Sequence, residues 1–558
     1  MKNLSWSIFV LLFSFTAILA QRELGVRPTD SGGPLMFEQA VFDVQNYDIS
    51  ISADPKTKSI AGTTVMTART VIPTNVIVLD LDSAYTISKL TDGIHDLKYE
   101  RKAGKIWIWF PMTKQVGEEI KTSITYAGVP KEAPRPPWVG GFMWKKTPNG
   151  ADWISVALQN DGADLMFPCK DHPSDKAATV SMHITVPDPL MAVGPGKYQG
   201  VKKNADSTST YNWRMTNPIA NYSIVFNAAP YKIIEDKYTT ATGETMPIYF
   251  YILPESFEKG ARLIAEQKKY LAFYEKYLGP YPFRSQKVGI VETPHLGMEH
   301  STAIAYGNQF KYNDDGTDTL LLHEFGHEYW ANLVTASDWR DFWIHEGFQS
   351  YMDTLYTETL HGKDAYMRSM RNRQRGFKNK QAVAPREPKL TYQVYMSEPD
   401  YVNSDGDIYG KGSYILHTLR YLVGDAAFFR SLRRMAYPTK AMEKLTDGSQ
   451  ERLVNTDDFL TIVNEESKMN LDWYFELYLR QPKLPTLVVS TTPECTSNCT
   501  MSLSWQTPNN LPFPMPVDVV IGGKSQRIEM KGGKGSVTYN GAAPAVDPDG
   551  WVLKSLSR

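Results

Sequence analysis

Residues 321–330 read LLHEFGHEYW and place two of the chain's 10 histidines, His323 and His327, four positions apart with Glu324 between them. On an α-helix, residues i and i+4 lie on one face, with their Cβ atoms roughly 5–6 Å apart. Two imidazoles in this arrangement can bind one metal ion, while Glu324 can reach a water molecule on that ion. The stretch therefore predicts a helix that carries a hydrolytic metal centre. The alternative is a pair of core histidines on a half-buried helix.

A third metal ligand is expected from Glu346 in WIHEGF, which is separated from His327 by eighteen intervening residues. This gap accommodates the end of the first helix, a turn at residues 336–339 and one or two turns of a second helix. A metzincin would need a histidine at position 333, which is Leu333. Two histidines and a glutamate predict one zinc ion per chain. Zinc activates water for attack on an amide, and we expect Glu324 to take the water's proton and deliver it to the leaving amine.

The composition is that of an ordinary globular protein, with 42% hydrophobic and 22% charged residues among 558. The formal net charge is -1. This balance gives no electrostatic reason to expect nucleic acid as a partner.

The first twenty residues, MKNLSWSIFVLLFSFTAILA, form a basic start followed by an apolar run that ends at Ala20. This pattern predicts a cleaved signal peptide over residues 1–20, with a short N-terminal membrane anchor as the alternative. No later stretch is long and apolar enough to span a bilayer. The protein is therefore expected to be periplasmic or secreted. In such a compartment Cys495 and Cys499 are close enough to form a disulfide, whereas Cys169 is expected to be a buried apolar residue.

Hydrophobic patterning predicts a multidomain α+β chain. Residues 21–240 alternate apolar and polar positions and indicate an all-β domain. Residues 241–483 mix short strands with helices, which are expected at 254–279, 317–334 and 341–362. Strand patterns return in residues 484–558, which are enough for a small β-sandwich.

With Glu346 in place, the pattern resembles the zinc aminopeptidases of peptidase family M1, gluzincins that include alanyl aminopeptidases and leukotriene hydrolase. The resemblance covers about residues 40–480 and includes three further stretches: FPCKDHPSDKA at 167–177, PYPF at 280–283 and YGKGSYILHTLR at 409–420. It implies a saddle-like N-terminal β-domain, a thermolysin-like catalytic domain and peptide substrates with a free N-terminus.

The stretch LGMEH at residues 296–300 resembles the family's G-x-M-E-N pattern, whose glutamate binds the substrate's free amino group. The resemblance assigns that role to Glu299 and places Gly297 and Met298 in the substrate pocket. The sequence departs from the pattern at Leu296 and His300. The amine-binding glutamate is retained, but the pocket for the first residue is expected to differ.

The resemblance assigns roles to two further polar residues. Gln159 corresponds to a second ligand of the amino group, and Tyr409 to a catalytic tyrosine whose phenol donates to the developing oxyanion. Three other conspicuous residues are interpreted as structural. His345 and Glu328 are expected on exposed helix surfaces, and His417 in the core or on a helix.

Many family members end in a large helical domain that closes the active-site cavity. Here only the predicted β-domain at 484–558 follows the catalytic region. We therefore expect a more open cleft, unless a second subunit covers it. No counterpart was found of the arginine with which some members bind a substrate carboxylate.

Together these features predict a zinc aminopeptidase that removes the N-terminal residue from peptides. A thermolysin-type endopeptidase is an alternative, but such an enzyme lacks the amine ligand and the tyrosine predicted at Glu299 and Tyr409. Epoxide hydrolysis, as in the leukotriene branch, is a second alternative. A non-catalytic binding protein on the same scaffold is a third, and the intact set His323, Glu324, His327, Glu346 and Tyr409 argues against it.

Overall fold

The computed structural model describes residues 32–396, 404–492 and 495–555, so the predicted signal peptide lies outside the described residues. The chain forms two compact units. Of the described residues, the first unit contains those up to Met215 together with Ile219–Pro230 and the described part of Lys389–Asp405. The second contains Thr216–Pro218, Tyr231–Pro388 and Gly406–Arg558.

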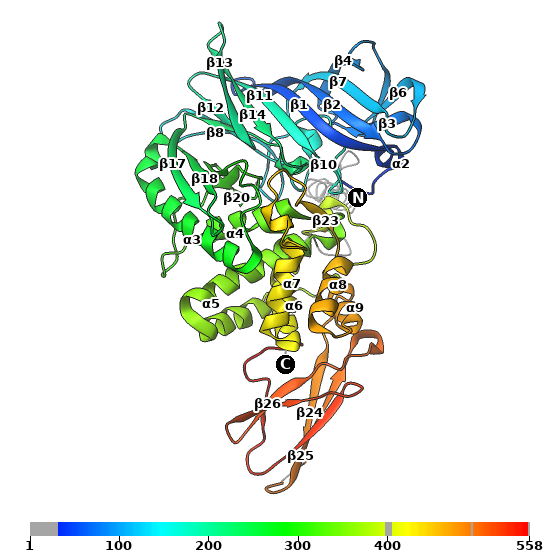
Figure 1. Cartoon of the computed structure of the whole chain (residues 1–558), viewed down its shortest axis with the longest axis vertical. Helices are drawn as coiled ribbons and strands as arrows, with labels where there is room; N and C mark the ends of the chain where they lie inside the picture. The colour runs from blue at the N-terminus through cyan, green and yellow to red at the C-terminus, as the bar shows by residue number, and fades with distance from the viewer. Residues whose placement is uncertain (1–31, 397–403, 493–494, 556–558) are drawn as a thin grey trace, which may run out of the picture. The chain divides into compact units, whose positions relative to one another are not determined.

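The first unit is built on a seven-stranded sheet in the order β13-β14-β11-β1-β2-β7-β4 (Figure 1). Strands β1 and β11 pair in parallel, and the other neighbours pair antiparallel. Alternation buries Tyr47, Ile49 and Ile51 on one face of β1, as a side-chain period of two requires. The seven strands are β1 (Phe42–Asp54), β2 (Ser59–Thr70), β4 (Tyr85–Thr91), β7 (Glu119–Gly128), β11 (Thr179–Pro187), β13 (Lys197–Lys203) and β14 (Thr208–Met215).

Smaller sheets complete this unit, so the described part of residues 21–240 is rich in strands, as expected. A three-stranded sheet contains β3 (Thr74–Asp80), β6 (Lys105–Lys114) and β5 (Lys98–Lys102). A four-stranded sheet contains β12 (Met191–Val193), β16 (Asn227–Ala229), β9 (Asp152–Ala157) and β8 (Gly141–Lys146), and a pair joins β10 (Lys176–Ala177) to β15 (Ile219–Ala220). Helix α2 (Phe37–Ala40) precedes β1. Cys169 is a free, buried cysteine, as predicted.

The second unit begins with a mixed five-stranded sheet in the order β17-β18-β19-β21-β20. Strand β19 pairs in parallel with both β18 and β21, and its five residues are all buried, which explains the apolar run in the sequence. The strands are β17 (Lys232–Thr239), β18 (Thr245–Ile252), β19 (Val288–Glu292), β20 (Gly297–Met298) and β21 (Ile304–Tyr306).

Helices follow and pack around this sheet, with α3 against β17 and β18, and α4 against β20 and β21 (Figure 1). They are α3 (Gly260–Leu278), α4 (Thr319–Gly326), α5 (Trp343–Gln374), α6 (Gly410–Val423), α7 (Asp425–Ala436), α8 (Thr456–Ser467) and α9 (Asp472–Arg480). A parallel pair joins β22 (Val334–Ala336) to β23 (Arg452–Val454). None of the helices in the described part of the chain has the length and apolar character that a membrane span requires.

The predicted helix at 317–334 is only partly correct. The α-helix ends at Gly326, and residues 328–333 form a π-type turn that contains non-helical backbone at Trp330. The predicted helix at 341–362 is longer than expected, since α5 continues to Gln374 beyond a break at Gly362, where φ is 76°. The helix expected at 254–279 is present as a 3-10 turn followed by α3, and it ends before Gly279.

Two three-stranded sheets form the C-terminal part of the second unit, which confirms the predicted β-sandwich. Their orders are β24-β25-β28 and β27-β26-β29. Met501 and Leu503 of one sheet share a buried core with Val517 and Val519 of the other. The strands are β24 (Thr486–Thr491), β25 (Cys499–Gln506), β26 (Val517–Ile521), β27 (Lys524–Ile528), β28 (Lys534–Tyr539) and β29 (Ala545–Val546).

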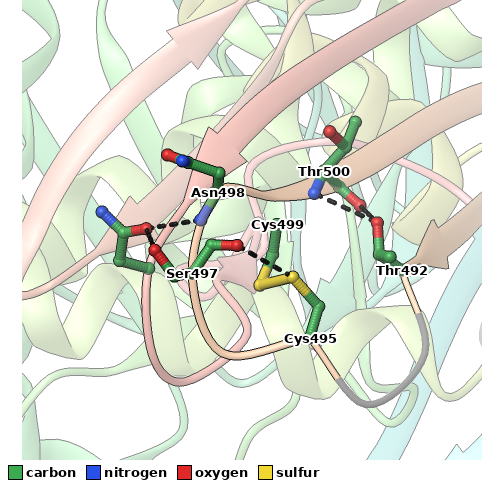
Figure 2. Close-up of a disulfide and its surroundings, with 7 residues drawn as sticks. Thr492, Cys495, Ser497, Asn498, Cys499 and Thr500 are labelled. Atoms are coloured by element: carbon green, nitrogen blue, oxygen red, sulfur yellow. Dashed lines mark hydrogen bonds between the residues drawn. A yellow bond between two sulfur atoms is a disulfide. The ribbon is translucent and has the colours of Figure 1, made fainter.

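A disulfide joins Cys495 to Cys499 at the start of β25, with the two Cα atoms 5.5 Å apart (Figure 2). The sequence left the oxidation state of these two residues open. The hairpin around the bond is also held by Asn498, whose backbone N–H donates to Asn540 Oδ1 at 2.7 Å.

Candidate active site

Helix α4 presents the histidines of the HEFGH stretch. Its N-cap is Asp318, which accepts a hydrogen bond from the backbone N–H of Leu321 at 3.0 Å and so fixes the helix start one turn before His323. Gly326 lets the helix approach its neighbours closely, because a Cβ there would overlap the side chains of Gln349 and Tyr274. His327 still has right-handed helical backbone, with φ -65° and ψ -14°, so the two imidazoles share one face.

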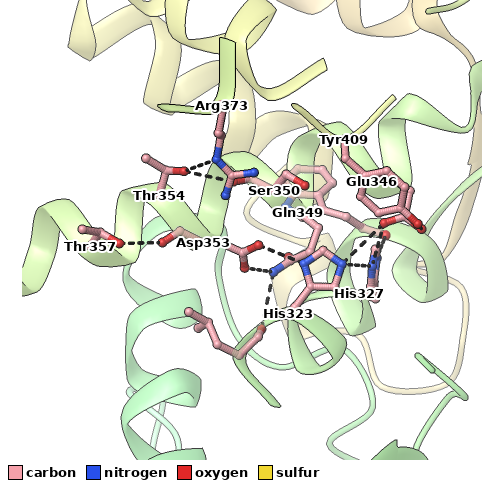
Figure 3. Close-up of polar contacts among 12 residues, drawn as sticks. His323, His327, Glu346, Gln349, Ser350, Asp353, Thr354, Thr357, Arg373 and Tyr409 are labelled. Atoms are coloured by element: carbon pink, nitrogen blue, oxygen red, sulfur yellow. Dashed lines mark hydrogen bonds and ion pairs between the residues drawn. The ribbon is translucent and has the colours of Figure 1, made fainter. Parts of the chain in front are cut away.

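Hydrogen bonds to Nδ1 of His323 and His327 orient the two rings so that their Nε2 atoms face each other (Figure 3). Nδ1 of His327 lies 2.8 Å from the carbonyl oxygen of Trp330, which can only accept, so Nδ1 carries the proton. Nδ1 of His323 lies 2.9 Å from Oδ2 of Asp353 and donates to it. Both Nε2 atoms are then unprotonated in the neutral rings, and they lie 3.2 Å apart. In the neutral rings two lone pairs face each other at this distance, an arrangement that is stabilised by a metal cation or by a proton that gives one ring a positive charge.

Glu346 completes the donor set from the first turn of α5. Its Oε2 lies 3.5 Å from His323 Nε2 and 3.3 Å from His327 Nε2. A tetrahedral zinc ion with bonds of ~2.0–2.1 Å separates its ligand atoms by about 3.4 Å, which agrees with all three separations. The donor types and their spacing therefore fit zinc, and this is the group that the sequence predicted.

Asp353, the residue that orients His323, is not part of any motif recognised in the sequence. Asp353 stands seven positions after Glu346 on α5, on the same helix face, and its Oδ1 accepts from Gln349 Nε2 at 2.9 Å. A carboxylate that holds the outer nitrogen of a ligating histidine fixes the tautomer and increases its basicity. A seven-residue spacing from the third ligand is the signal that could have identified it.

Glu324 is buried and projects beside the ligands. A Cβ at Gly297 would lie 2.6 Å from Glu324 Oε1, so the absence of a side chain at Gly297 makes room for the carboxylate. Burial raises the pKa of Glu324 to about 8; the positive charge of His323 opposes the shift, and the negative charge of Glu299 adds to it. A dication held by the three ligands acts in the opposite direction and favours the carboxylate. Burial and a bound dication therefore act in opposite directions on the pKa of this carboxyl group.

Glu299 is brought to the same place, as predicted. It follows β20, is buried, and has a carboxylate oxygen that lies within 4.8 Å of a ligand atom of both Glu324 and His327. Met298 is buried next to it, whereas Leu296 is 43% exposed. Glu299 is therefore a buried carboxylate at the site in addition to the candidate ligand Glu346 and the expected base Glu324.

His300, which replaces the asparagine of the family pattern, is fully buried and its ring lies 6.5 Å from that of His295. Burial lowers the pKa of both imidazoles, to about 4 for His295 and well below the usual value for His300. Both rings are therefore neutral at neutral pH. A neutral imidazole thus stands where the family pattern has a neutral amide, so His300 adds no charge next to Glu299.

Tyr409, at the N-terminus of α6, donates from its phenol to Glu346 Oε1 at 3.0 Å. Its ring stacks on His323 with 6.3 Å between centroids. The predicted tyrosine thus lies beside two of the three candidate ligands (Figure 3). Gln159 belongs to the first unit, where its Oε1 accepts from the phenol of Tyr395 at 3.0 Å, and its role at the site stays a prediction.

Two structural interpretations were wrong. His345 is buried rather than exposed, and its Nε2 accepts from the backbone N–H of Ala336 at 2.9 Å, because the connection between α4 and α5 folds back onto it. Glu328 is fully buried rather than exposed, because the backbone after His327 leaves α-helical geometry. The interpretation of His417 as a core residue of a helix is confirmed.

Comparisons with known proteins agree with this geometry. Residues 44–223 match the peptidase M1 N-terminal domain, and residues 262–478 match the peptidase family M1 domain. A "Probable aminopeptidase 1" of Saccharolobus solfataricus is 23% identical over 369 residues, which are 63% of this chain and 44% of the relative. The leukotriene A-4 hydrolase of Xenopus laevis is 24% identical over 58% of this chain and 53% of its own. The chain thus spans about half the length of these curated relatives.

A solved structure of a mutant M1 zinc metallopeptidase from Deinococcus radiodurans, bound to a Tyr-Ser-Ala substrate, shares the fold with a TM-score of 0.64. The two chains are 22% identical, and the match covers 82% of this chain and 98% of the other. The cofactor is zinc, and its candidate ligands are the two histidines and the glutamate described above. Because both domain descriptions are of the same family and together span more than two thirds of the 558 residues, the chain belongs to peptidase family M1.

Proposed function

We propose that this protein is a zinc-dependent aminopeptidase that hydrolyses the first peptide bond of peptides with a free N-terminus. The observation that carries the proposal is the position of Glu299, a buried carboxylate that is not one of the three metal ligands and yet lies within 4.8 Å of Glu324 and His327 donor atoms. Aminopeptidases among the relatives, and solved neighbours with bound amino acids or peptide, support the same assignment.

Glu299 supplies the selectivity. A charged hydrogen bond from a substrate ammonium to this carboxylate contributes about 1.5–3 kcal/mol. Since the carboxylate lies next to the metal ligands, an anchored ammonium brings only the adjacent peptide bond to the reacting position. Peptides with a blocked N-terminus cannot make this bond.

Glu324 is proposed as the general base and acid. Zinc, when bound, activates a water molecule and polarises the peptide carbonyl. Glu324 takes the proton from that water and passes it to the leaving nitrogen, a role that fits its buried carboxyl group beside the candidate ligands. Its burial excludes bulk water from the proton path.

Tyr409 is proposed to stabilise the charge that develops on the carbonyl oxygen. Its phenol donates to Glu346 in this structure and can turn toward the substrate from the same side of the ligands. A donor of this kind is worth about 2.7–4 kcal/mol in the transition state. A thermolysin-type endopeptidase or a binding protein without activity gives no reason for Glu299 and Tyr409 to accompany the metal ligands.

The test compares a peptide with its N-acetylated twin. The wild-type protein should cleave the free peptide and leave the acetylated one nearly intact. Glu299→Ala should lower kcat/KM for the free peptide by about 10- to 100-fold, which corresponds to the loss of one charged hydrogen bond. Equal cleavage of both peptides by the wild type would contradict the proposal.

We further propose that the protein is secreted or periplasmic after removal of residues 1–20. The apolar run before Ala20 and the bond between Cys495 and Cys499 support this, because disulfides persist in oxidising compartments. Intact-mass analysis of the protein from its native host should give a chain that begins at Gln21. A cytosolic protein that retains residues 1–20 would contradict it.

A further inference from the structure

Residues 328–332, which follow helix α4, form hydrogen bonds with the loop that carries Glu299. This loop, residues 299–303, connects β20 to β21. At its start, the carbonyl oxygen of Glu299 accepts from Asn332 Nδ2 at 3.0 Å. At its end, the backbone N–H of Thr302 donates to Glu328 Oε1 at 2.7 Å. Both hydrogen bonds are buried, and both partners come from residues 328–332.

The π-type turn makes this arrangement possible. The backbone N–H of Asn332 donates to the carbonyl of His327, five residues earlier, at 3.0 Å, and Trp330 has φ -101° and ψ 67°. In a continued α-helix each residue would be rotated by about 100° from the one before, and the peptide groups would bond to one another. Here the Trp330 carbonyl is instead directed to His327 Nδ1. The same few residues therefore hold a metal ligand and both flanks of the Glu299 loop.

The loop is held in a conformation that it would not adopt alone. Thr302 has φ 57°, a left-handed backbone that β-branched residues rarely adopt, and it is fully buried. Its carbonyl oxygen lies so close to Gly289 that a Cβ there would overlap it. Strained backbone at a functional site persists only where its surroundings fix it. The hydrogen bond from Thr302 to Glu328 is one of the contacts that fix it.

We propose that Glu328 and Asn332 are positioning residues that set the separation between the Glu299 carboxylate and the metal ligands, and so determine the selectivity for a free N-terminus. This inference rests on the proposed aminopeptidase function, because it concerns the group that binds the substrate's amine. Neither residue touches the reacting atoms. Both act through the loop of residues 299–303.

The experiment uses the full-length zinc-loaded protein with a free-amine aminoacyl fluorogenic substrate and with the peptide pair described above. Glu328→Leu removes the acceptor at similar volume, while Glu328→Gln retains an acceptor oxygen and serves as the rescue variant. Asn332→Ala removes the donor at the other end of the loop. Tyr421→Phe is a matched control, because it removes a partly buried hydrogen bond to Asp518, 2.7 Å long, in the same unit and away from the site.

We expect Glu328→Leu and Asn332→Ala to raise KM for the free-amine substrate by about tenfold, comparable to the loss of one charged hydrogen bond, with zinc content unchanged. Glu328→Gln and Tyr421→Phe should keep the wild-type KM. A defect of folding alone lowers the amount of active enzyme, and hence apparent kcat, but leaves KM unchanged. If one variant fails to fold, the other still tests its own end of the loop.

Wild-type KM in both Glu328→Leu and Asn332→Ala would overturn the inference, provided that the wild type prefers the free peptide. A raised KM in Glu328→Gln equal to that in Glu328→Leu would also overturn it, since the acceptor would then be irrelevant. If the wild type cleaves the acetylated peptide equally well, the proposed function itself fails, which is a distinct result.

Discussion

Nδ1 of His323 lies 2.9 Å from Oδ2 of Asp353, two helical turns after Glu346 on the same helix. The hydrogen bond joins α4 to α5, the two helices that carry the candidate ligands. It places the proton on Nδ1 and leaves Nε2 available for zinc. Asp353 therefore prepares the metal site although it is not itself a candidate ligand.

Asp353→Ala should weaken zinc affinity by about 10- to 100-fold, the usual effect of losing a partner that orients a ligating histidine. Asp353→Asn should have a smaller effect, because the amide oxygen can still accept from Nδ1. Affinity is measured by competition with a chelator of known zinc affinity. Thr359→Ala, further along α5, is the control and should match the wild type. Unchanged affinity in Asp353→Ala would show that the hydrogen bond does not support the metal.

Glu324→Gln should retain zinc and lose turnover by orders of magnitude. The amide has nearly the same shape as the carboxyl group, so the space beside Gly297 stays filled, but it cannot take up a proton. Zinc content by elemental analysis and kcat on a free-amine substrate are measured on the same preparation. A variant with full zinc and wild-type kcat would exclude Glu324 as the base.

Tyr409→Phe should lower kcat by about 10²–10³-fold with little change in KM, because the phenol is expected to bond to the oxygen only as charge develops on it. The ring that stacks on His323 is preserved in this variant, so zinc content should stay at the wild-type level. Steady-state kinetics separate the two parameters. A rise in KM with kcat unchanged would instead assign Tyr409 to ground-state binding.

The stability of the protein should fall in mild acid, in part because of His417. Its Nε2 lies 3.2 Å from the Gly550 carbonyl and its Nδ1 lies 2.6 Å from the Tyr366 phenol, so the folded ring is neutral with its proton on Nε2. Burial lowers its pKa to about 3. In the unfolded chain His417 has a pKa near 6.5 and binds a proton in mild acid, whereas the folded imidazole stays unprotonated. Protonation therefore favours the unfolded state, and stability is lost as the pH falls below about 6.5.

The expected loss for His417 between pH 7 and pH 5 is about 2 kcal/mol. His417→Gln keeps a donor and an acceptor but cannot titrate, so its thermal midpoint should fall less between these two values of pH. A residual decrease is expected from buried His295, whose pKa is lowered to about 4. Thr461→Ala on α8 is the control, because it removes an exposed hydrogen bond to the Asp457 carbonyl and no titratable group, and it should retain the wild-type pH dependence. An identical decrease in His417→Gln and wild type would contradict the assignment.

The part of the site that could be predicted follows from regular helix geometry and from family motifs. His323 and His327 share a helix face because they are four residues apart. Glu346, Glu299 and Tyr409 were recognised from the spacing and motifs of the family. The structure brings all five close to one another with Glu324. The strands of the first unit were predictable because alternating burial, as in β1, leaves a period of two in the sequence.

The errors arise where the backbone departs from that geometry. Glu328 was placed on an exposed surface by extending an α-helix past His327, but the π-type turn redirects its side chain to Thr302. His345 was misplaced because its partner, the backbone of Ala336, comes from a connection whose path no local pattern specifies. Asp353 was missed because its partner lies on another helix, 30 residues earlier in the chain.

The most direct test of this account is the zinc content of the purified, untagged protein, together with its activity before and after chelation. We predict one zinc ion per chain, loss of peptide hydrolysis after exhaustive chelation and recovery on adding one equivalent of zinc. His323→Ala should neither bind the ion nor recover. A metal-free protein that keeps full turnover after chelation would contradict the account.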